Sequence, residues 1–318
     1  MLTPKVLGKF AMNDDNIESS TGILIDWGTT NLRAYLVNNY GKILETRQRA
    51  QGIRNVEDGK FSDAIRDILK GWDSTCPVLM SGMIGSAQGW HEVPYVTCPS
   101  SVEDIAQGLA TITDHPRFSI VPGLSYQAPD GAFDVMRGEE VQIFGALDMS
   151  KQKDAILCLP GTHSKWASVK GGVLESFSTS MTGEVYSILK IHSILGALMT
   201  EGPDDEAAYK RGLERSGTEG GLLHHLFSTR TEGLFEKIQP DGLPSYMSGI
   251  LIGHELRNSV PSDLNGNPVL LVSEGVLGQK YMSALEFFEI PAQLVSAEEA
   301  TVRGLDILQK IVTMKGKK

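Results

Sequence analysis

Short apolar runs separated by turn residues open the recognisable pattern of this chain. Residues 23–27 read Ile-Leu-Ile-Asp-Trp, residues 28–31 read Gly-Thr-Thr-Asn, and residues 32–37 read Leu-Arg-Ala-Tyr-Leu-Val. A second turn, Asn-Asn-Tyr-Gly at 38–41, precedes a further short run at 42–46. β-Branched and apolar runs broken by Gly and Asn are typical of strands joined by tight turns. We therefore expect three neighbouring strands here.

After these predicted strands, the spacing of the apolar residues becomes that of a helix. Apolar residues at 61–72 recur at the spacing of an amphipathic helix, and residues 77–81 form an apolar strand. The following segment, 82–95, is rich in glycine and is predicted to be irregular. Ligands of α/β folds gather beyond the carboxyl ends of strands, so this segment is a candidate substrate loop. The alternative is a surface connection with Trp90 and Tyr95 packed beneath it.

The first pattern occurs a second time. Residues 156–169 again read as an apolar run, a Gly-Thr turn and another run, and a Lys-Gly-Gly turn leads into 173–177. Gly28 and Gly161 lie at matching points of the two units, which indicates an internal duplication. Only the first unit has an acid, Asp26, before its glycine. We therefore expect the two turns to have different roles.

A polar linker at 150–154 precedes the second unit and marks the predicted domain boundary. We predict a tail over 1–21, a first domain over 22–150 and a second domain over 151–318. The tail lacks the continuous apolar stretch of a signal peptide. The other predicted elements are helices at 102–109, from Glu139, from about residue 180, at 246–256, 279–287 and 297–311, strands at 118–121 and 269–272, a glycine loop at 273–278, and mixed helices and loops at 201–240.

Composition narrows the class of protein. The 318 residues suffice for two domains of ordinary size, and 41% hydrophobic with 21% charged residues is typical of a soluble globular protein. A net charge of −10 without a basic run argues against a nucleic-acid surface. No apolar run reaches the roughly 18 residues of a membrane span. Cys76, Cys98 and Cys158 have neither metal-ligand spacing nor the number of a disulfide framework, which favours a reducing cytoplasm.

The first turn is the clearest candidate for chemistry. A glycine turn flanked by the hydroxyls of Thr29 and Thr30 can cradle a phosphate. Asp26, at the end of the preceding strand, could hold a cation against that phosphate. The alternative is an ordinary hairpin in which the aspartate caps a turn.

An acidic pair, Glu139-Glu140, lies at a predicted helix start. Acids at that position interact favourably with the helix dipole, which is the structural interpretation. The functional interpretation is that one of them extends into a cleft as a general base.

Three kinds of feature occur along the chain: two Gly-Thr hairpins, an acidic pair, and a late strand followed by a glycine loop and a helix. Their order resembles the sugar-kinase branch of the actin-like ATPase superfamily. Residues 26–33 match its first phosphate motif, Asp-x-Gly-Thr-x-x-x-Arg. Residues 159–163 resemble its second phosphate motif, and residues 273–275 its adenosine motif. The resemblance implies an α/β fold of two ribonuclease H-like domains around a central ATP cleft.

A closer resemblance, over residues 22–308, is to the 2-dehydro-3-deoxygalactonokinases. It implies transfer of the γ-phosphoryl group of ATP, with Mg²⁺, to O6 of 2-dehydro-3-deoxy-D-galactonate in galactonate catabolism. Alternatives are a kinase for another sugar or sugar acid on the same fold, or a non-catalytic ATP-binding regulatory protein. The blocks that carry this resemblance are residues 25–30, 82–86, 137–140, 159–166 and 181–184.

The resemblance also implies residue roles. Asp26 would hold Mg²⁺, and we favour Glu139 over Glu140 as the base, although related kinases use an aspartate and the spacing does not decide. A homo-oligomer is left open, as is the cation that meets the substrate carboxylate, for which the candidates are Arg33, Arg137, His163 and Lys165. The expected nucleotide-binding residues are Gly28, Thr29, Thr30, Arg33, Gly161, Thr162, His163, Gly275 and Gly278, and the expected substrate-binding residues are Gly82, Met83, Ile84, Gly85, Ser86, Arg137 and Lys165.

Overall fold

The computed structural model describes residues 20–264 and 266–315, and the expected tail over 1–21 lies outside this range except for Ser20 and Thr21, whose backbone belongs to the first strand. Within the described residues, no helix is both long enough and apolar enough to cross a membrane.

The strands are β1 (Ser20–Trp27), β2 (Leu32–Asn38), β3 (Ile43–Arg49), β4 (Val78–Ser81), β5 (Val96–Thr97), β6 (Ala110–Ile112), β7 (His115–Ile120), β8 (Leu124–Gln127), β9 (Phe133–Met136), β10 (Ala155–Leu159), β11 (Ser164–Lys170), β12 (Val173–Ser180), β13 (Val269–Ser273) and β14 (Ala292–Ser296). The α-helices are α1 (Phe61–Ile68), α2 (Val102–Gln107), α3 (Glu139–Ser150), α4 (Thr182–His192), α5 (Glu206–Arg215), α6 (Gly221–Leu234), α7 (Leu243–Ser259), α8 (Gly275–Phe287) and α9 (Ala297–Lys315).

Two sheets share one strand order. The first runs β3-β2-β1-β4-β7-β6, and the second runs β12-β11-β10-β13-β14. In each sheet the first three strands are antiparallel, and the strand at the centre pairs in parallel with the next one. Apart from β6 at one edge, the two sheets are therefore two copies of one architecture. This confirms the predicted duplication and the predicted α/β fold class.

Central strands of both sheets are buried on both faces. Ile23, Leu24 and Ile25 of β1 are buried completely, as are Leu270 and Leu271 of β13. Strands covered on both faces have continuous apolar runs instead of an alternating pattern. The apolar runs at 23–27 and 269–272 were for this reason visible in the sequence.

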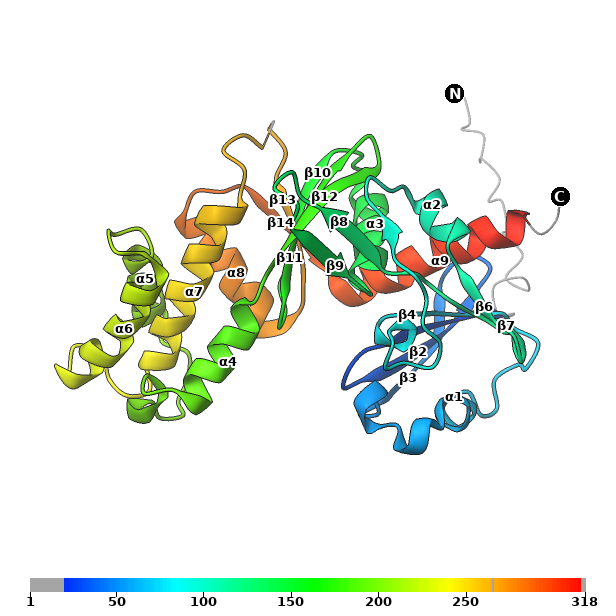
Figure 1. Cartoon of the computed structure of the whole chain (residues 1–318), viewed down its shortest axis with the longest axis horizontal. Coiled ribbons are helices and arrows are strands. Elements are labelled where there is room, and N and C mark those ends of the chain that lie inside the picture. The colour runs from blue at the N-terminus through cyan, green and yellow to red at the C-terminus, as the bar shows by residue number, and fades with distance from the viewer. Residues whose placement is uncertain (1–19, 265, 316–318) are drawn as a thin grey trace, which may run out of the picture.

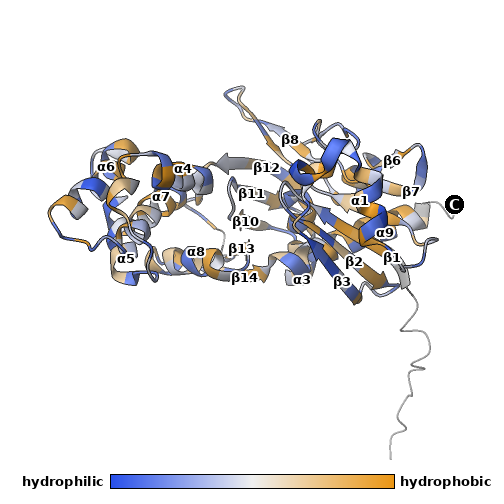
Figure 2. Cartoon of the chain, turned by 90° about the horizontal axis from the view of Figure 1, so that it is seen from below, coloured by the Kyte–Doolittle hydropathy of each residue, from blue (hydrophilic) through white to orange (hydrophobic). Residues whose placement is uncertain are grey.

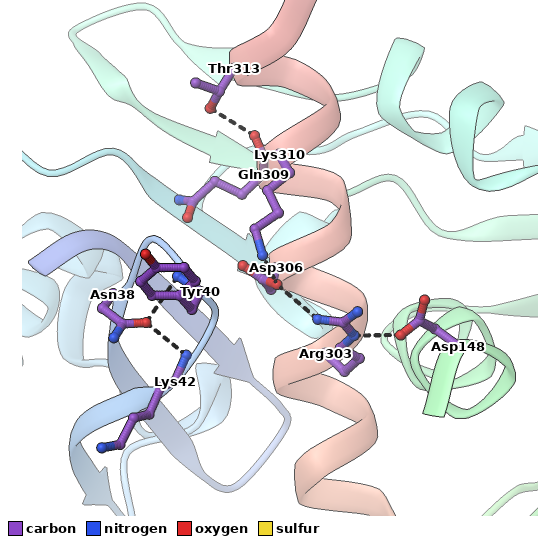
Figure 3. A network of polar contacts seen from close by, with 9 residues as sticks. All are labelled: Asn38, Tyr40, Lys42, Asp148, Arg303, Asp306, Gln309, Lys310 and Thr313. Carbon is purple, nitrogen blue, oxygen red and sulfur yellow. Dashed lines mark hydrogen bonds and ion pairs between the residues drawn. The ribbon is translucent and has the colours of Figure 1, made fainter. Parts of the chain in front are cut away.

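Helices α3 and α9 lie between the two sheets (Figure 1). They pack closely because glycines face backbone: a Cβ on Gly145 would lie 1.9 Å from the Ala300 carbonyl oxygen, and one on Gly304 would lie 2.0 Å from that of Val141. At the far end of the pair, Arg303 Nε donates to Asp148 at 2.6 Å (Figure 3). The last helix thus joins both halves of the molecule.

The polar network of Figure 3 continues along α9 toward the hairpin between β2 and β3. The buried carboxylate of Asp306 accepts from Lys310 Nζ at 2.6 Å and pairs with Arg303 at 3.4 Å. Gly41 lies against the same carboxylate, since a Cβ there would be 2.5 Å from Asp306 Oδ2. The two sheets lie on either side of the boundary near residue 150, whereas α9 packs on elements of both. The division into two separate domains stays a prediction.

A group of helices, α4 to α7, projects from the second sheet (Figure 1). The small residues of α7 permit close packing, as expected: a Cβ on Gly249 would lie 2.2 Å from the Tyr209 carbonyl oxygen of α5. Gly212 of α5 faces the Tyr246 carbonyl oxygen in the same way, at 2.1 Å. These contacts fix the helical group as one layer beside the sheet.

Two predicted boundaries were wrong, and one small sheet was not predicted. Helix α8 begins at Gly275, so the expected loop at 273–278 is mostly the first turn of a helix. Helix α1 ends at Ile68, before the expected residue 72. The sheet formed by β5, β8 and β9 was not predicted, because strands of two to four residues give too short an alternation to recognise.

Candidate active site

The first expected phosphate loop is a tight turn between β1 and β2. The Gly28 N–H donates to the Asn31 carbonyl oxygen at 2.9 Å, which closes the turn. Asp26 stands at the carboxyl end of β1 and keeps 28% of its side chain exposed, with Arg33 Nη1 at 3.7 Å across the strand pair. Burial raises the pKa of Asp26, the Arg33 charge opposes this, and the charge of Glu139 adds to the rise. The acid of β1 and the acid of α3 are therefore close neighbours.

A second segment, residues 52–54, supports this loop from behind. The N–H groups of Gly52 and Ile53 donate to the carbonyl oxygens of Thr30 at 2.8 Å and of Gly28 at 3.0 Å. A Cβ on Gly52 would lie 2.2 Å from the Thr30 nitrogen, so only glycine fits. Because these loop carbonyls are engaged on one side, the exposed Thr30 side chain faces the other. Sequence reasoning missed Gly52, which belongs to no motif.

The second expected phosphate loop, residues 161–163, is supported by the start of α4. A Cβ on Gly183 would lie 2.4 Å from the Gly161 carbonyl oxygen, and the Glu184 N–H donates to the Thr162 carbonyl oxygen at 3.0 Å. His163 Nε2 contacts the Glu184 carboxylate. Gly161 itself has open space where a Cβ would be. The loop is thus held by α4 and open on its other side.

Beside this loop lies a pocket of about 430 Å³ between α4, α7 and α8. Its walls are largely apolar, from Leu251 and Ile252 of α7 and Val276 and Leu277 of α8, while Lys280 adds one cation. An apolar pocket with a few polar groups is the usual form of a small-molecule site. Of the expected adenosine residues, Gly275 begins α8 at this pocket, whereas Gly278 packs against Ser273 and Leu294, with a Cβ position 3.3 Å from Ser273 Cβ and Oγ and 3.6 Å from Leu294 Cδ1.

A buried carboxylate connects the walls of this pocket. Glu255 of α7 accepts from Trp166 Nε1 at 2.8 Å, from Tyr281 Oη at 2.7 Å and from the Thr182 hydroxyl. Ser164 lies within 3.0 Å of the same tyrosine hydroxyl. Burial raises the pKa of Glu255. One side chain thus joins β11, α4, α7 and α8 around the pocket, and no sequence motif marked it.

Replacing Glu255 with Leu is expected to destabilise the fold by about 3 kcal/mol, because the buried Trp166 N–H loses its acceptor and two hydroxyls lose theirs. Thr182 and Tyr281 line the pocket, so the affinity of this pocket for its ligand is expected to fall. Glu255→Gln is the matched control, because its amide oxygen can still accept from Trp166. Urea denaturation and ligand-binding measurements report the two effects. Equal affinities in both variants and the unsubstituted protein would contradict a positioning role.

The acidic pair divides into two different environments. Glu139 is partly exposed, and the Arg137 N–H donates to its Oε2 at 3.0 Å. Burial raises its pKa, and the charge of Lys165 is the largest effect that opposes the rise. Glu139 is therefore within electrostatic range of Asp26 from the first sheet and of Lys165 from the second.

Glu140 is completely buried. The Gly138 N–H donates to its Oε2 at 2.6 Å, and its Oε1 has no hydrogen-bond partner among the described residues. Burial, followed by the charge of Glu139, raises the pKa of Glu140 to about 8. A carboxyl in this position is neutral at pH 7 and lies away from solvent, which fits a structural role at the start of α3.

The pKa of Glu140 predicts a dependence of stability on pH. Because the folded-state pKa, about 8, exceeds the ordinary 4.5, the folded protein keeps a proton that the unfolded chain releases. The resulting stability is complete below the unfolded pKa and is lost as the pH rises through the folded pKa. Glu140→Gln mimics the protonated acid, so its free energy of unfolding is expected to fall less than that of the unsubstituted protein between pH 5 and pH 8. Urea midpoints across this range test it, and parallel curves would refute it.

The expected substrate loop, residues 82–86, follows β4. It passes close to Asp26 and to Gly138, the residue before Glu139. Gly82, with φ +95°, fits between Trp27 and Gly138, where a Cβ would lie 2.8 Å from the Trp27 carbonyl oxygen. The Ser86 hydroxyl donates within the loop to the Met83 carbonyl oxygen at 2.7 Å. The Ile84 side chain is buried in the core beside the first sheet and anchors the loop there.

Both Arg137 and Lys165 contact protein groups, but the buried Nε and Nη1 of Arg137 have no hydrogen-bond partner among the described residues. Arg137 lies behind the substrate loop: its Nη2 donates to the Val93 carbonyl oxygen at 2.8 Å and its guanidinium stacks 4.5 Å from the Tyr95 ring. A Cβ on Gly85 would lie 2.8 Å from Arg137 Nη1, so loop and arginine are in contact. Lys165 is buried, and its Nζ donates to the Val135 carbonyl oxygen at 2.9 Å and to the Thr179 hydroxyl at 2.7 Å.

Two sheets of one architecture with a glycine loop on each have the fold of the actin-like, sugar-kinase type. Comparison with known proteins then gives the family. The family model described as 2-keto-3-deoxy-galactonokinase matches residues 26–308, and the chain belongs to this family.

Relatives of this family match almost the whole chain. The 2-dehydro-3-deoxygalactonokinase of Escherichia coli (strain K12) is 30% identical over 284 residues, which are 89% of this chain and 95% of the relative. The probable 2-dehydro-3-deoxygalactonokinase DgoK1 of Rhizobium meliloti (strain 1021) is 32% identical over 295 residues, 91% and 96% of the two chains. A crystal structure from Sinorhizobium meliloti, of a protein for which the same activity has been suggested, superposes with a TM-score of 0.84 at 30% identity over 92% of this chain and 99% of its own.

Proposed function

We propose that this protein transfers the γ-phosphoryl group of ATP to O6 of 2-dehydro-3-deoxy-D-galactonate, which yields 2-dehydro-3-deoxy-6-phospho-D-galactonate and ADP. The observation that carries the proposal is that Glu139, in a chain of this family, lies within electrostatic range of Asp26 of the first sheet and of Lys165 of the second. In the reaction the O6–H bond and the bond between the γ-phosphorus and its bridging oxygen break, and a new O–P bond forms.

Glu139 is the proposed general base. A base must accept the hydroxyl proton as the bond to phosphorus forms, and it works best when its pKa lies near the operating pH. Burial raises the pKa of Glu139 above its ordinary value, and the charge of Lys165 opposes that rise. The Arg137 N–H at 3.0 Å fixes the direction of the carboxylate without occupying both of its oxygens.

The nucleotide is assigned to the pocket beside the second phosphate loop. Its 430 Å³ and apolar walls suit a nucleoside, and the open side of Gly161 gives room for a phosphate. The first loop, with Thr29 and Thr30, lies on the other sheet and would face the terminal phosphate. Bound ATP supplies the phosphoryl group and its leaving group. Protein groups on both sides would neutralise charge on the transferred group, which is the main form of catalysis in phosphoryl transfer.

Mg²⁺ is assigned to Asp26. Among the described residues no group of three or more His, Cys, Asp or Glu side chains could hold a metal ion. Magnesium in kinases needs no such group, because one or two carboxylates, phosphate oxygens and water complete its shell. Asp26 fits, with a partly exposed carboxylate at a strand end. Asp26→Asn is expected to raise the Mg²⁺ concentration required for half-maximal activity by about 10- to 100-fold. An unchanged magnesium titration would remove this assignment.

The substrate is assigned to the space before the loop at 82–86. Lys165 is the proposed partner of the substrate carboxylate, because two of its three N–H groups bond to protein and one remains. Arg137 would act from behind, by holding the loop in place. We also propose that the reaction takes place in the cytoplasm, which the three free and buried cysteines support.

An assay of ADP release with ATP and Mg²⁺ across 2-keto-3-deoxy sugar acids, aldonic acids and free sugars tests the function. Turnover confined to the 2-keto-3-deoxy acids is expected, with the galactonate-derived acid preferred. Turnover on a free sugar instead would keep the fold and discard the substrate. ATP binding without turnover on any compound would overturn the proposal in favour of a regulatory ATP-binding protein.

A further inference from the structure

Helix α6 has an apolar face on each side. Its inner face packs on α7 through the buried side chains of His225, Leu226 and Thr229. Its outer face also carries apolar side chains: Leu223 is 85% exposed, Phe227 55% and Leu234 54%. The helix lies at the end of the molecule farthest from the first sheet, in both views (Figures 1 and 2). The outward face of a surface helix is normally polar. An apolar outward face is therefore typical of a site that binds another molecule.

The outer residues follow a regular helical spacing. Leu223, Phe227, Arg230 and Leu234 are separated by four, three and four residues. This is the spacing at which side chains form a seam between two packed helices. Leu222, 36% exposed, and Phe235, 74% exposed, extend the apolar surface at its two ends.

We propose that α6 packs antiparallel against α6 of a second copy of the chain, about a twofold axis midway between Ser228 and Thr229. Around that point each residue of the seam meets a suitable partner. Leu223 faces Leu234 of the second copy, Phe227 faces its Arg230, and Leu222 faces its Phe235. A twofold interface requires this self-complementarity, since each contact occurs twice.

The one charged residue of the seam fits this pairing. Arg230 is partly buried and makes no hydrogen bond or ion pair with any residue in the described part of the chain. A guanidinium over an aromatic ring is a favourable contact, and the proposed register places Arg230 over Phe227 of the second copy. The neighbouring acid, Glu232, lies outside the seam and already pairs with Arg211 of its own chain.

The exposed area is also sufficient. An aromatic side chain buries roughly 150–250 Å², and leucines less, so the five exposed apolar residues of this surface offer at most on the order of 600 Å² per copy. Two copies would bury at most on the order of 1,200 Å², which exceeds the roughly 1,000 Å² expected of a specific interface. Because α6 packs on α7, whose Leu251 and Ile252 line the nucleotide pocket, the dimer would also support that pocket.

Sedimentation equilibrium of the full chain tests the register by exchange of charges. The unsubstituted protein is expected to be a dimer. Phe227→Arg places an arginine opposite Arg230 and is expected to give a monomer, whereas the double variant Phe227→Arg/Arg230→Glu places opposite charges together and is expected to restore the dimer. Ile191→Arg, at a 70% exposed apolar position on α4, is the control and should remain dimeric. A monomeric unsubstituted protein, or a dimer that survives Phe227→Arg, would overturn the proposal.

Disulfide cross-linking provides a second measurement that does not depend on affinity. The three native cysteines are buried, so they contribute little background. The double variant Leu223→Cys/Leu234→Cys is expected to form covalent dimers under mild oxidation, and either single variant is not. Cross-linking by the single variant Leu223→Cys would show a different register and would refute the antiparallel pairing.

Discussion

Glu139→Gln is expected to lower kcat for phosphoryl transfer by about 100- to 10,000-fold, the range that a positioned general base contributes. The amide keeps the size of the carboxylate and can still accept from the Arg137 N–H, so the loop before α3 should retain its shape. What it loses is the ability to take up the substrate proton. KM for ATP should change little, because the pocket proposed for the nucleotide is lined by α4, α7 and α8.

Glu140→Gln is the matched control for this experiment. Both residues are glutamates at the start of α3, but only Glu139 reaches the region shared by the two sheets. Glu140 is buried and, with a pKa of about 8, is already neutral at pH 7. Its substitution should therefore leave kcat within a few-fold of the original. If Glu139→Gln kept full activity, or if Glu140→Gln abolished it, the base would have to be reassigned.

Gly52→Ala is expected to reduce kcat/KM for ATP by about 100-fold, because displacement of a catalytic loop by as little as an ångström has an effect of this size. The backbone of Gly52 has φ −64° and ψ 174°, which alanine adopts without strain. The penalty is one of space, since the new methyl group would overlap the backbone of Thr29 and Thr30 at 2.2–2.3 Å. We also expect a loss of about 1–3 kcal/mol in the free energy of unfolding, as is usual for overpacking.

Gly161→Ala is the informative partner of that variant. A Cβ at Gly161 meets no protein atom within 4 Å, so the free energy of unfolding should not change. The methyl group would, however, enter the space assigned to a phosphate, and KM for ATP should rise. Thermal denaturation combined with ATP kinetics separates the two cases. A Gly161→Ala enzyme with unchanged ATP kinetics would place the phosphates elsewhere, and an unaffected Gly52→Ala enzyme would mean that the first loop tolerates displacement.

Much of the fold could be predicted because its central strands are continuous apolar runs. The repeated unit at 156–169 has the same strand order as the first, and the acids at 139–140 begin a helix as expected. The part between residues 201 and 240 was harder: α5 and α6 lie there, where only mixed helices and loops were predicted. Short strands such as β5 were not predicted, because two residues are too few to show a strand pattern.

The candidate site shows a similar division. The sequence predicts two phosphate loops, because glycine and threonine at a strand end have a recognisable chemistry, and phosphate binding by these residues stays a prediction. Gly52 and Glu255 could not be predicted from the sequence. Gly52 leaves room for the backbone of the first loop, and Glu255 bonds to residues far away in the chain. Substrate binding by Arg137 stays a prediction: the Val93 carbonyl and the Tyr95 ring hold one side of its guanidinium, while Nε and Nη1 have no partner among the described residues.

Helix α9 also determines the order in which the molecule can fold. Leu24 of the first strand and Leu79 of β4 share a hydrophobic core with Val302, Leu305 and Leu308 of α9. A ribosome delivers the strands of the first sheet long before it delivers this helix, so the nascent first half exposes apolar surface until synthesis is nearly complete. Contacts between such distant parts of a chain also slow folding. The first sheet and its covering helix are therefore neighbours in space but are separated by almost the whole time of translation.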